Sequence, residues 1–284
     1  MSARALAGIG LLATVVAQPA VAGLQPVTAP TDSPLNIWSS AQYSEGDQHR
    51  RGGVQGYEVQ IQGGGVGVDG RLSDSWRLGL RYRAQQAELK QAGHDVLHID
   101  GEFVRATASF TRERFAFELG LTGGEVEHDD RLSAPDSTGT VLGADAQWGY
   151  RYPLQGTVVV EPLIQLRYAR SELNGSQPLQ EIGEAGIGVR WSGYFQAGPG
   201  RVEQRIQLMA LRDYLADSNG TITLLMLGDQ AVVTHPERPQ RHSYQAALGL
   251  SYYLGPLVLS AGYDYLERSG YYADSLSVAV RYDF

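Results

Sequence analysis

The chain has 284 residues, no cysteine and a formal net charge of −8. The lack of cysteine excludes disulfides and thiolate metal sites, and the acidic balance argues against a nucleic-acid partner, which would need a basic face. Glycine (35 residues) and tyrosine (16 residues) are frequent, whereas charged residues make up only 19%. The mean hydropathy of −0.24 is too polar for a bundle of transmembrane helices but suits a membrane β-barrel, in which only every second residue faces lipid.

The N-terminus has the features of a secretory signal peptide. Arg4 supplies a positive charge, residues 5–16 are apolar, and Ala20 and Ala22 form an A-x-A cleavage motif that places the mature start near Gly23. The apolar run is shorter than the ~20 residues that a bilayer-spanning helix needs, which favours cleavage over an uncleaved anchor. Residues 1–22 are therefore predicted to be a signal peptide. Residues 23–34 contain three prolines and are predicted to be an extended linker.

From residue 35 to the C-terminus, apolar and polar residues alternate in segments that are separated by turn residues. This period of two is typical of β-strands with one apolar face. In residues 76–83, for example, Trp76, Leu78 and Leu80 point to one side and three arginines point to the other. Short turns alternate with long polar loops, which is the layout of outer-membrane barrels. Residues 35–284 are therefore predicted to form one all-β domain, a transmembrane antiparallel up-and-down barrel of about 12 strands.

Two stretches depart from the simple pattern. Residues 63–65 are three glycines, and Val59 and Ile61 before them are out of phase with the valines that follow. This change of phase predicts a bulge or a glycine kink. Residues 221–234 also have strand character, but their arms are too short to span a membrane, so a hairpin above the membrane is predicted. If the two arms did span, the barrel would have fourteen strands.

The last strand has the clearest single feature of the sequence. Counting back from the terminal phenylalanine, alternate residues are apolar or aromatic. These residues are Leu276, Val278, Val280, Tyr282 and Phe284. A terminal phenylalanine with an aromatic residue two positions before it resembles the sorting signal that the outer-membrane barrel assembly machinery reads.

If the apolar faces contact lipid, the opposite faces line the lumen. The acids expected there are Asp69, Glu118, Asp145, Glu161, Glu184, Glu203, Asp264 and Asp283. The expected basic residues are Arg77, Arg81, Arg83, Arg105, Arg151, Arg167, Arg190, Arg205 and Arg281. This near-balance of charge predicts paired networks rather than the one-signed ring of an ion-selective channel. Glycines on the same faces, such as Gly67 and Gly120, are expected to give the wall low, smooth patches.

Several segments resemble the autotransporter β-domain family. Residues 65–82 (GVGVDGRLSDSWRLGLRY) are similar to its signature of a Gly-x-Asp strand, a polar corner and a Trp-Arg-x-Gly strand. Residues 161–173 (EPLIQLRYARSEL) are similar to its Glu-Pro strand, and residues 245–265 and 281–284 resemble its last three strands. The similarity covers most of residues 35–284. It implies a twelve-stranded barrel that helps to export an N-terminal passenger, assisted by the barrel assembly machinery.

Only twelve residues separate the expected cleavage site from the first strand, so no passenger is expected in this chain, and the proline-rich residues 23–34 do not suit the helical linker of the family. The predicted function is that of a passive pore, a translocator or a surface scaffold in the cell outer membrane, without enzymatic activity and without a cofactor or metal. Outer-membrane lipid, lipopolysaccharide and the assembly machinery are the expected partners, together with a surface ligand or a passenger supplied in trans.

The alternative is an outer-membrane hydrolase with an Asp/His site at the rim, as in omptin-like proteases. Histidines and acids adjoin one another in or beside two long loops, and a carboxylate can orient a histidine that acts as a base. These residues are His94, Asp95, His98, Asp100, His128, Asp129 and Asp130. A Ser/His phospholipase site is less favoured, because no inward Ser–His pair is visible. A weak Ca²⁺ site at Asp129, Asp130 and Asp136 is also an alternative to a solvated acidic loop.

Overall fold

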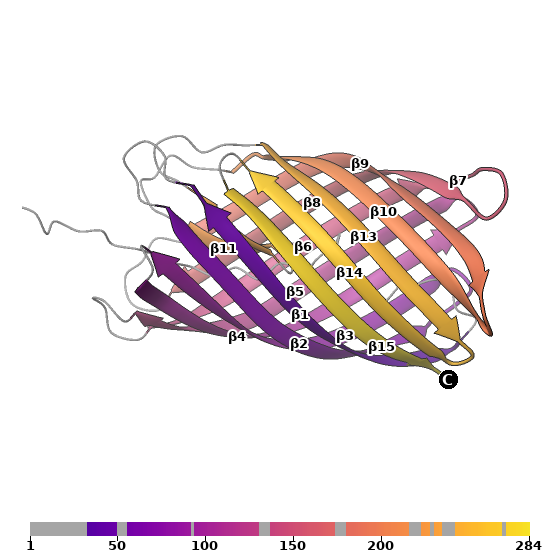
Figure 1. Cartoon of the computed structure of the whole chain (residues 1–284), viewed down its shortest axis with the longest axis horizontal. Helices are drawn as coiled ribbons and strands as arrows, with labels where there is room; N and C mark the ends of the chain where they lie inside the picture. The colour runs from indigo at the N-terminus through magenta and orange to yellow at the C-terminus, as the bar shows by residue number, and fades with distance from the viewer. Residues whose placement is uncertain are drawn as a thin grey trace, which may run out of the picture.

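The computed structural model describes residues 33–49, 56–91, 94–130, 137–173, 180–215, 223–227, 230–234, 242–268 and 271–284. The signal peptide, its cleavage site at Ala20, Ala22 and Gly23, and most of the linker lie outside these residues. The described part is a closed antiparallel barrel (Figure 1). No helix in the described part is long and apolar enough to cross a membrane.

Twelve strands form the wall, so the predicted fold class is confirmed. They are β1 (Leu35–Gln48), β2 (Tyr57–Arg71), β3 (Trp76–Gln91), β4 (His94–Arg112), β5 (Phe115–Asp130), β6 (Ser137–Tyr150), β8 (Val159–Leu173), β9 (Gln180–Ala197), β10 (Gly200–Asp213), β13 (His242–Leu254), β14 (Leu257–Arg268) and β15 (Tyr271–Asp283). The short β7 (Tyr152–Pro153) continues β6 and pairs with β8. Each strand pairs with its sequence neighbour, and β1 pairs with β15 to close the barrel.

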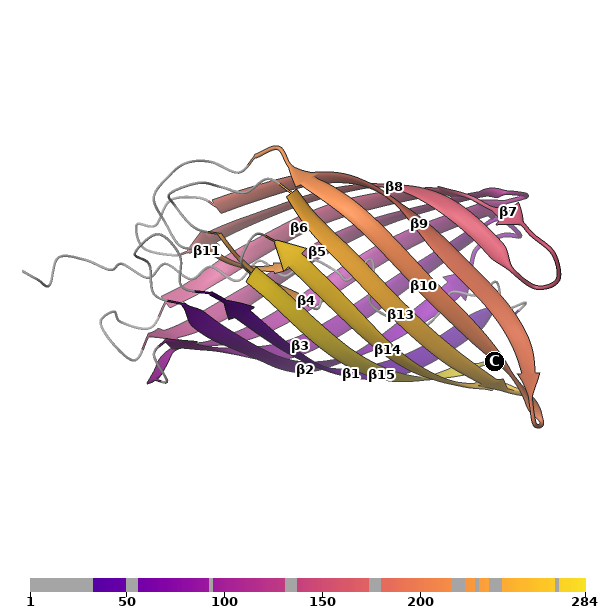
Figure 2. The same ribbon diagram turned by 45° about the horizontal axis from the view of Figure 1, so that its top comes forward.

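The strands cross the barrel at a slant, with tight turns at one end and longer connections at the other (Figures 1 and 2). Both Leu35 and Phe284 lie at the tight-turn end, where the Phe284 amide donates to the Leu35 carbonyl at 3.0 Å. The long connections are shorter than the sequence indicated, because the wall strands continue into them. For example, β3 and β4 run to Gln91 and from His94.

Near the tight-turn end, the outer face of the wall is apolar, as the alternation predicted. In β15, Leu276, Val278, Val280 and Tyr282 are 47–58% exposed, whereas the intervening Arg281 is 2% exposed. The same division recurs around the wall and gives an apolar outer band of the kind that faces lipid.

Towards the end with long connections, this division is reversed. On the outer face of β5, Leu119 and Leu121 give way to Glu125, Glu127 and Asp129. The inner face there is apolar. Its buried cluster consists of Tyr57, Val59, Ile61, Ala87, Leu89, Leu97, Ile99, Phe103, Val126, Val141, Ala169, Ile182, Leu266, Tyr271 and Ala273. The barrel therefore extends beyond the apolar band as a water-facing cylinder with an apolar interior.

This reversal explains the change of phase at residues 63–65, where the predicted bulge was wrong. The pairing of β2 with β1 and with β3 runs without a register shift from Tyr57 to Gly70. Val59 and Ile61 point inward, and Val66 and Val68 point outward, so the phase of the strand never changes. What changes is which side of the wall is apolar. The register shift recorded between β3 and β4 lies instead at Leu89/Lys90.

The hairpin predicted within residues 221–234 is present. Strands β11 (Thr223–Leu227) and β12 (Gln230–Thr234) pair with each other in a separate two-stranded sheet. They do not join the wall, so the fourteen-strand alternative is wrong. The backbone of β12 lies next to β15, β1 and β2.

Candidate functional site: the barrel interior

Arg105 on β4 is the centre of one charged cluster on the inner face. Its two terminal nitrogens lie 2.5 and 3.1 Å from the carboxylate oxygens of Asp145 on β6, in a bidentate pair. Glu118 on β5 is 3.7 Å from the same guanidinium. The side chains of Arg105 and Asp145 are 3% and 2% exposed. A bidentate pair that is this well buried fixes both side chains in one geometry.

A second cluster joins β8, β9, β10, β13 and β14. Glu184 lies 3.8 Å from both Arg167 and Arg268, and Arg268 also contacts Asp213 at 2.9 Å. Arg167 donates to Gln245 at 3.1 Å. The sequence did not single out Arg268 and Asp213 because they fall at the strand ends, beside segments expected as loops.

Arg190 on β9 is the centre of a third cluster. Its guanidinium donates to Gln207 at 2.8 Å, to Gln147 at 3.0 Å and to Glu161 at 3.3 Å. Arg151 approaches the other oxygen of Glu161 at 3.9 Å. The glutamines were missed because the sequence reasoning considered only charged residues, although they occupy inward positions of the same alternation.

The tight-turn end of the interior contains the remaining charges. Trp38 donates its indole N–H to Asp69 at 2.8 Å, and the Arg81 guanidinium lies 4.5 Å from the Trp38 ring centroid. Arg77 donates to the Ser33 carbonyl at 3.1 Å. These contacts tie β1, β2 and β3 together where the chain enters the barrel.

On the other side of the same end, Glu203 accepts hydrogen bonds from Tyr253 at 2.6 Å and Arg205 at 3.1 Å. Arg281 pairs with Asp283 at 2.8 Å. Arg83 is half-buried and Asp264 is 3% exposed, and both lie on the inward side of their strands.

Inward glycines leave room for large side chains of neighbouring strands, which pack over them, so these glycines do not form open patches. A Cβ at Gly67 would overlap the Trp38 ring, and one at Gly120 would overlap the Arg105 guanidinium. Glu161 lies over Gly149 in the same way, and the Met209 sulfur lies over Gly188. The prediction of low, smooth patches was wrong for these positions, because each gap is filled from the adjacent strand.

Of the rim residues in the described part, one histidine and one acid form a pair, and this pair lies outside the lumen. His98 lies 3.3 Å from Asp100, and both are on the outer face of β4. His128 is 4% exposed and points inward, whereas Asp129 points outward, so the two cannot pair. His94, Asp95 and Asp130 lie in strands, and their side chains are outside the described part, as is Asp136. Among the described residues, no group of three or more histidine or acidic side chains could hold a metal ion.

Comparison with known proteins identifies the barrel. The model of the autotransporter β-domain family matches residues 37–265. The chain belongs to the autotransporter β-domain family. It is therefore a translocator-type barrel of the outer membrane, as the sequence resemblance implied.

Solved autotransporter barrels share the fold. The β-domain of the Bordetella autotransporter BrkA is 17% identical, with a TM-score of 0.67 over 88% of this chain and 100% of that one. The transport unit of AIDA-I from Escherichia coli is 12% identical, with a TM-score of 0.68 over 92% of this chain and 93% of that one. Outer membrane protein B of Rickettsia prowazekii (strain Madrid E) is 22% identical over 292 residues, which cover 87% of this chain but 17% of that protein. The chain thus spans about a sixth of that relative.

Proposed function

We propose that this barrel is a passive conduit through which a polypeptide segment crosses the outer membrane, without chemistry of its own. The observation that carries this proposal is the pairing of charges on the inner face. Arg105 with Asp145, Arg167 with Glu184 and Arg190 with Glu161 cancel one another locally. A wall with both signs of charge has no strong selectivity for one ion, and it suits a chain of mixed sequence.

The residues expected to line the passage are the inward charges described above, from Asp69 to Arg281. The signal peptide of residues 1–22, cleaved before Gly23, delivers the chain to the periplasm, and residues 23–34 lead into the first strand. The face of Leu276, Val278, Val280, Tyr282 and Phe284 engages the assembly machinery. Outer-membrane lipid and lipopolysaccharide surround the apolar band. The passenger is joined to the barrel or supplied in trans.

A surface-display experiment tests the conduit. A small epitope-tagged reporter domain is inserted between residues 30 and 31, and its sensitivity to protease added to intact cells is measured. We expect the reporter to be cleaved from outside while the barrel stays assembled. A fusion that ends before residue 35 is the control and keeps the reporter inside. A folded barrel in the outer membrane whose reporter remains in the periplasm would overturn the proposal.

Single-channel conductance separates a conduit from a surface scaffold. Residues 23–284 are refolded and compared with residues 35–284 in planar bilayers. Open steps in either form support a passage through the barrel, and steps only in the shorter form identify residues 23–34 as its plug. Silence of both forms, with heat-modifiable mobility of the folded barrel retained, favours the scaffold.

A further inference from the structure

The end of the barrel with the long connections, called the mouth below, is more completely buried on its inside than the middle of the barrel. On β3, the inward Ala87 and Leu89 of the mouth are each 2% exposed, whereas the inward Arg81 and Arg83 nearer the middle are only half-buried. An empty tube would show the opposite gradient, because water enters it at the ends. The mouth is therefore filled by another part of the chain.

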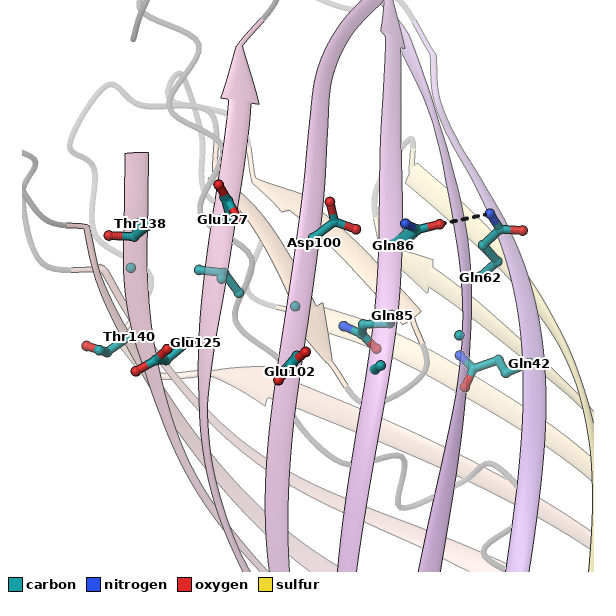
Figure 3. Close-up of a pocket in the computed structure, with 15 residues that line it drawn as sticks. Gln42, Gln62, Gln85, Gln86, Asp100, Glu102, Glu125, Glu127, Thr138 and Thr140 are labelled. Carbon is teal, nitrogen blue, oxygen red and sulfur yellow. Dashed lines mark hydrogen bonds between the residues drawn. The ribbon is translucent and has the colours of Figure 1, made fainter. Parts of the chain in front are cut away.

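The outer face of the same strands is polar and open to water. It has a cavity of about 960 Å³ whose lining includes Gln62, Gln86, Glu102 and Glu125, all exposed on that face (Figure 3). Gln62 donates to Gln86 there at 3.3 Å. An apolar segment is not stabilised on such a surface, since burying carboxylates and amides costs free energy. An apolar segment at the mouth therefore belongs on the inner face.

The β11–β12 hairpin is the segment that reaches this place (Figures 1 and 2). Cα atoms of β12 come within 8 Å of those of β15, β1 and β2. The inward Ser44 and Ala273 are 1% and 0% exposed, whereas the outward Tyr43 and Tyr272 are 44% and 37% exposed. Because only the inward side of β1 and β15 is covered, the hairpin lies in the lumen.

Small side chains on β1 and β15 allow this close approach. Stacked sheets usually lie about 10 Å apart, so a closer approach needs small residues between them. The inner face presents Ser44, Ala273 and Ser275 here. The Ser44 hydroxyl is bonded to the Asp274 carbonyl at 2.9 Å, so its donor is already used within the wall. Elsewhere the mouth carries larger side chains, such as Ile99 on β4. The wall is thus shaped for the hairpin at β1 and β15.

The sequence of the hairpin suits a buried position. Strand β11 is TLLML and β12 is QAVVT, and neither contains a charged residue. The run of four apolar residues at 224–227 makes both faces of β11 apolar, which is typical of a strand without a water-facing side. An isolated two-stranded hairpin is marginally stable at best in water. The apolar inside of the mouth supplies the packing that the hairpin needs.

We propose that the β11–β12 hairpin is a plug that closes the mouth of the barrel until a passing chain displaces it. Within the described part, the hairpin forms its own sheet and shares no strand pairing with the wall, so it can leave without breaking the barrel. The hydroxyls of Tyr57 and Tyr271 are buried on the inner face of β2 and β15 without a hydrogen-bond partner among the described residues. Opening the mouth to water relieves this cost. The plug rests on the proposed conduit, because it closes that passage.

Single-channel recording on residues 23–284 tests the plug. In the test barrel, residues 223–234 are replaced by a Gly-Ser sequence of the same length. We expect the unaltered barrel to open only briefly and the replacement to raise the open fraction about tenfold, because losing the burial of one leucine-sized side chain already shifts an equilibrium by roughly that factor. The matched control replaces residues 174–179, in the connection between β8 and β9, in the same way and leaves the open fraction unchanged.

A cross-link tests the same plug in a barrel that keeps its hairpin, in case the replacement does not fold. The chain has no cysteine, so Val232→Cys with Ala273→Cys gives one pair, which is joined by a short reducible cross-linker. We expect this pair to link efficiently, the linked barrel to lose its brief openings, and a reductant to restore them. The control pair is Val232→Cys with Tyr272→Cys, which should not link because Tyr272 is on the outer face of β15.

Three results would overturn the plug: an unchanged open fraction after replacement of the hairpin, linking of residue 232 to 272 as readily as to 273, or openings that persist in the linked barrel. The surface-display experiment is run on the same barrels, so that the two proposals fail separately. If replacing the hairpin opens the barrel but no reporter reaches the surface, the conduit is refuted. If the reporter is displayed and replacing the hairpin changes nothing, the plug is refuted.

Discussion

Arg105 on β4 reaches Asp145 on β6 across the bare backbone of Gly120 on the strand between them. The pair is bidentate and almost fully buried. Replacing Arg105 with methionine leaves the Asp145 carboxylate buried without its main partner, and this costs about 3–5 kcal/mol. We expect a loss of unfolding free energy of this size for Arg105→Met, measured by urea unfolding from lipid vesicles.

Two further variants show whether the loss comes from the buried charge. Arg105→Met combined with Asp145→Leu removes both charges and is expected to recover most of the stability. Arg170→Met removes an arginine of an exposed pair with Glu172, which contributes about 0–1 kcal/mol at most. Equal losses for Arg105→Met and Arg170→Met would contradict the assignment of Arg105 as a buried structural charge.

Gly67 is expected to be intolerant of any side chain. A Cβ there would overlap the Trp38 ring, which lies over Gly67 while its N–H bonds to Asp69 at 2.8 Å. Gly67→Ala should therefore cost about 1–3 kcal/mol through overpacking and change the tryptophan fluorescence. Gly70→Ala on the same strand is the control, because the nearest atom to its Cβ would be 4.0 Å away. Wild-type fluorescence in Gly67→Ala would show that the position of the Trp38 ring does not depend on the absence of a side chain at residue 67.

Much of the fold was predictable from alternation alone. A strand that exposes Leu276, Val278 and Val280 on one side and buries Arg281 on the other has the same signature in the sequence and in the structure. The number of strands was also predictable, because turn residues separate each membrane-crossing segment from the next. Alternation records only which residues share a face, however, and not what that face touches. Val59 and Val66 were read as out of phase because both were assumed to face lipid.

The interior was less predictable, since its contacts join residues far apart in sequence. The inward charges could be assigned to one face, but not to partners: Arg105 pairs with an acid 40 residues away, and Arg167 bonds to Gln245, 78 residues away. Sequence reasoning also passed over the neutral residues. On β3, Gln85 is buried on the inner face and Gln86 is exposed on the outer face. The sequence does not show which of the two is buried, because the apolar face of the wall changes sides beyond the apolar band.

His128 should make the stability of the barrel beyond the apolar band depend on pH. It lies on β5 beyond the apolar band, 4% exposed, and burial lowers its pKa to about 4. The unfolded chain binds the proton near pH 6.5, whereas the folded barrel binds it only near pH 4, so this stability is complete above about pH 7 and falls as the pH drops from about 6.5 to 4. We expect a loss of about 2 kcal/mol between about pH 7.5 and pH 5.

Urea unfolding at these two pH values measures the effect. His128→Phe should show a smaller pH dependence than the unaltered barrel, because it has no imidazole to protonate. His98→Phe changes an outward-facing histidine of the neighbouring strand and serves as the control. An unchanged pH dependence in His128→Phe would show that other groups are responsible.

The position of the apolar band can be tested on one face of β5. Leu119 is 38% exposed within the band, and Glu125 lies six residues further along the same face, beyond it. Arginine near the middle of a bilayer destabilises a barrel by about 2–4 kcal/mol, and near or beyond the interface by about 0–1 kcal/mol. Leu119→Arg should therefore lower the unfolding free energy strongly and Glu125→Arg only slightly, in vesicles. Similar losses for both variants would mean that the band extends past Glu125.

The C-terminal face is expected to matter more for assembly in cells than for the stability of the finished barrel. Tyr282 and Phe284 are 47% and 60% exposed, and their rings lie 5.0 Å apart on the outer surface, so they bury little against the wall. The backbone at this position is held independently of the rings, since the Phe284 amide bonds to Leu35 and its carbonyl accepts from Ser33. Phe284→Ser should therefore refold in detergent with normal heat-modifiable mobility but insert several-fold less in the outer membrane of cells.

Tyr272→Ser, which changes another outward aromatic of β15 far from the terminus, is the control. Equal insertion of Phe284→Ser and Tyr272→Ser would show that the terminal aromatic is not read as a signal, and failure of Phe284→Ser to refold in detergent would make its role structural instead.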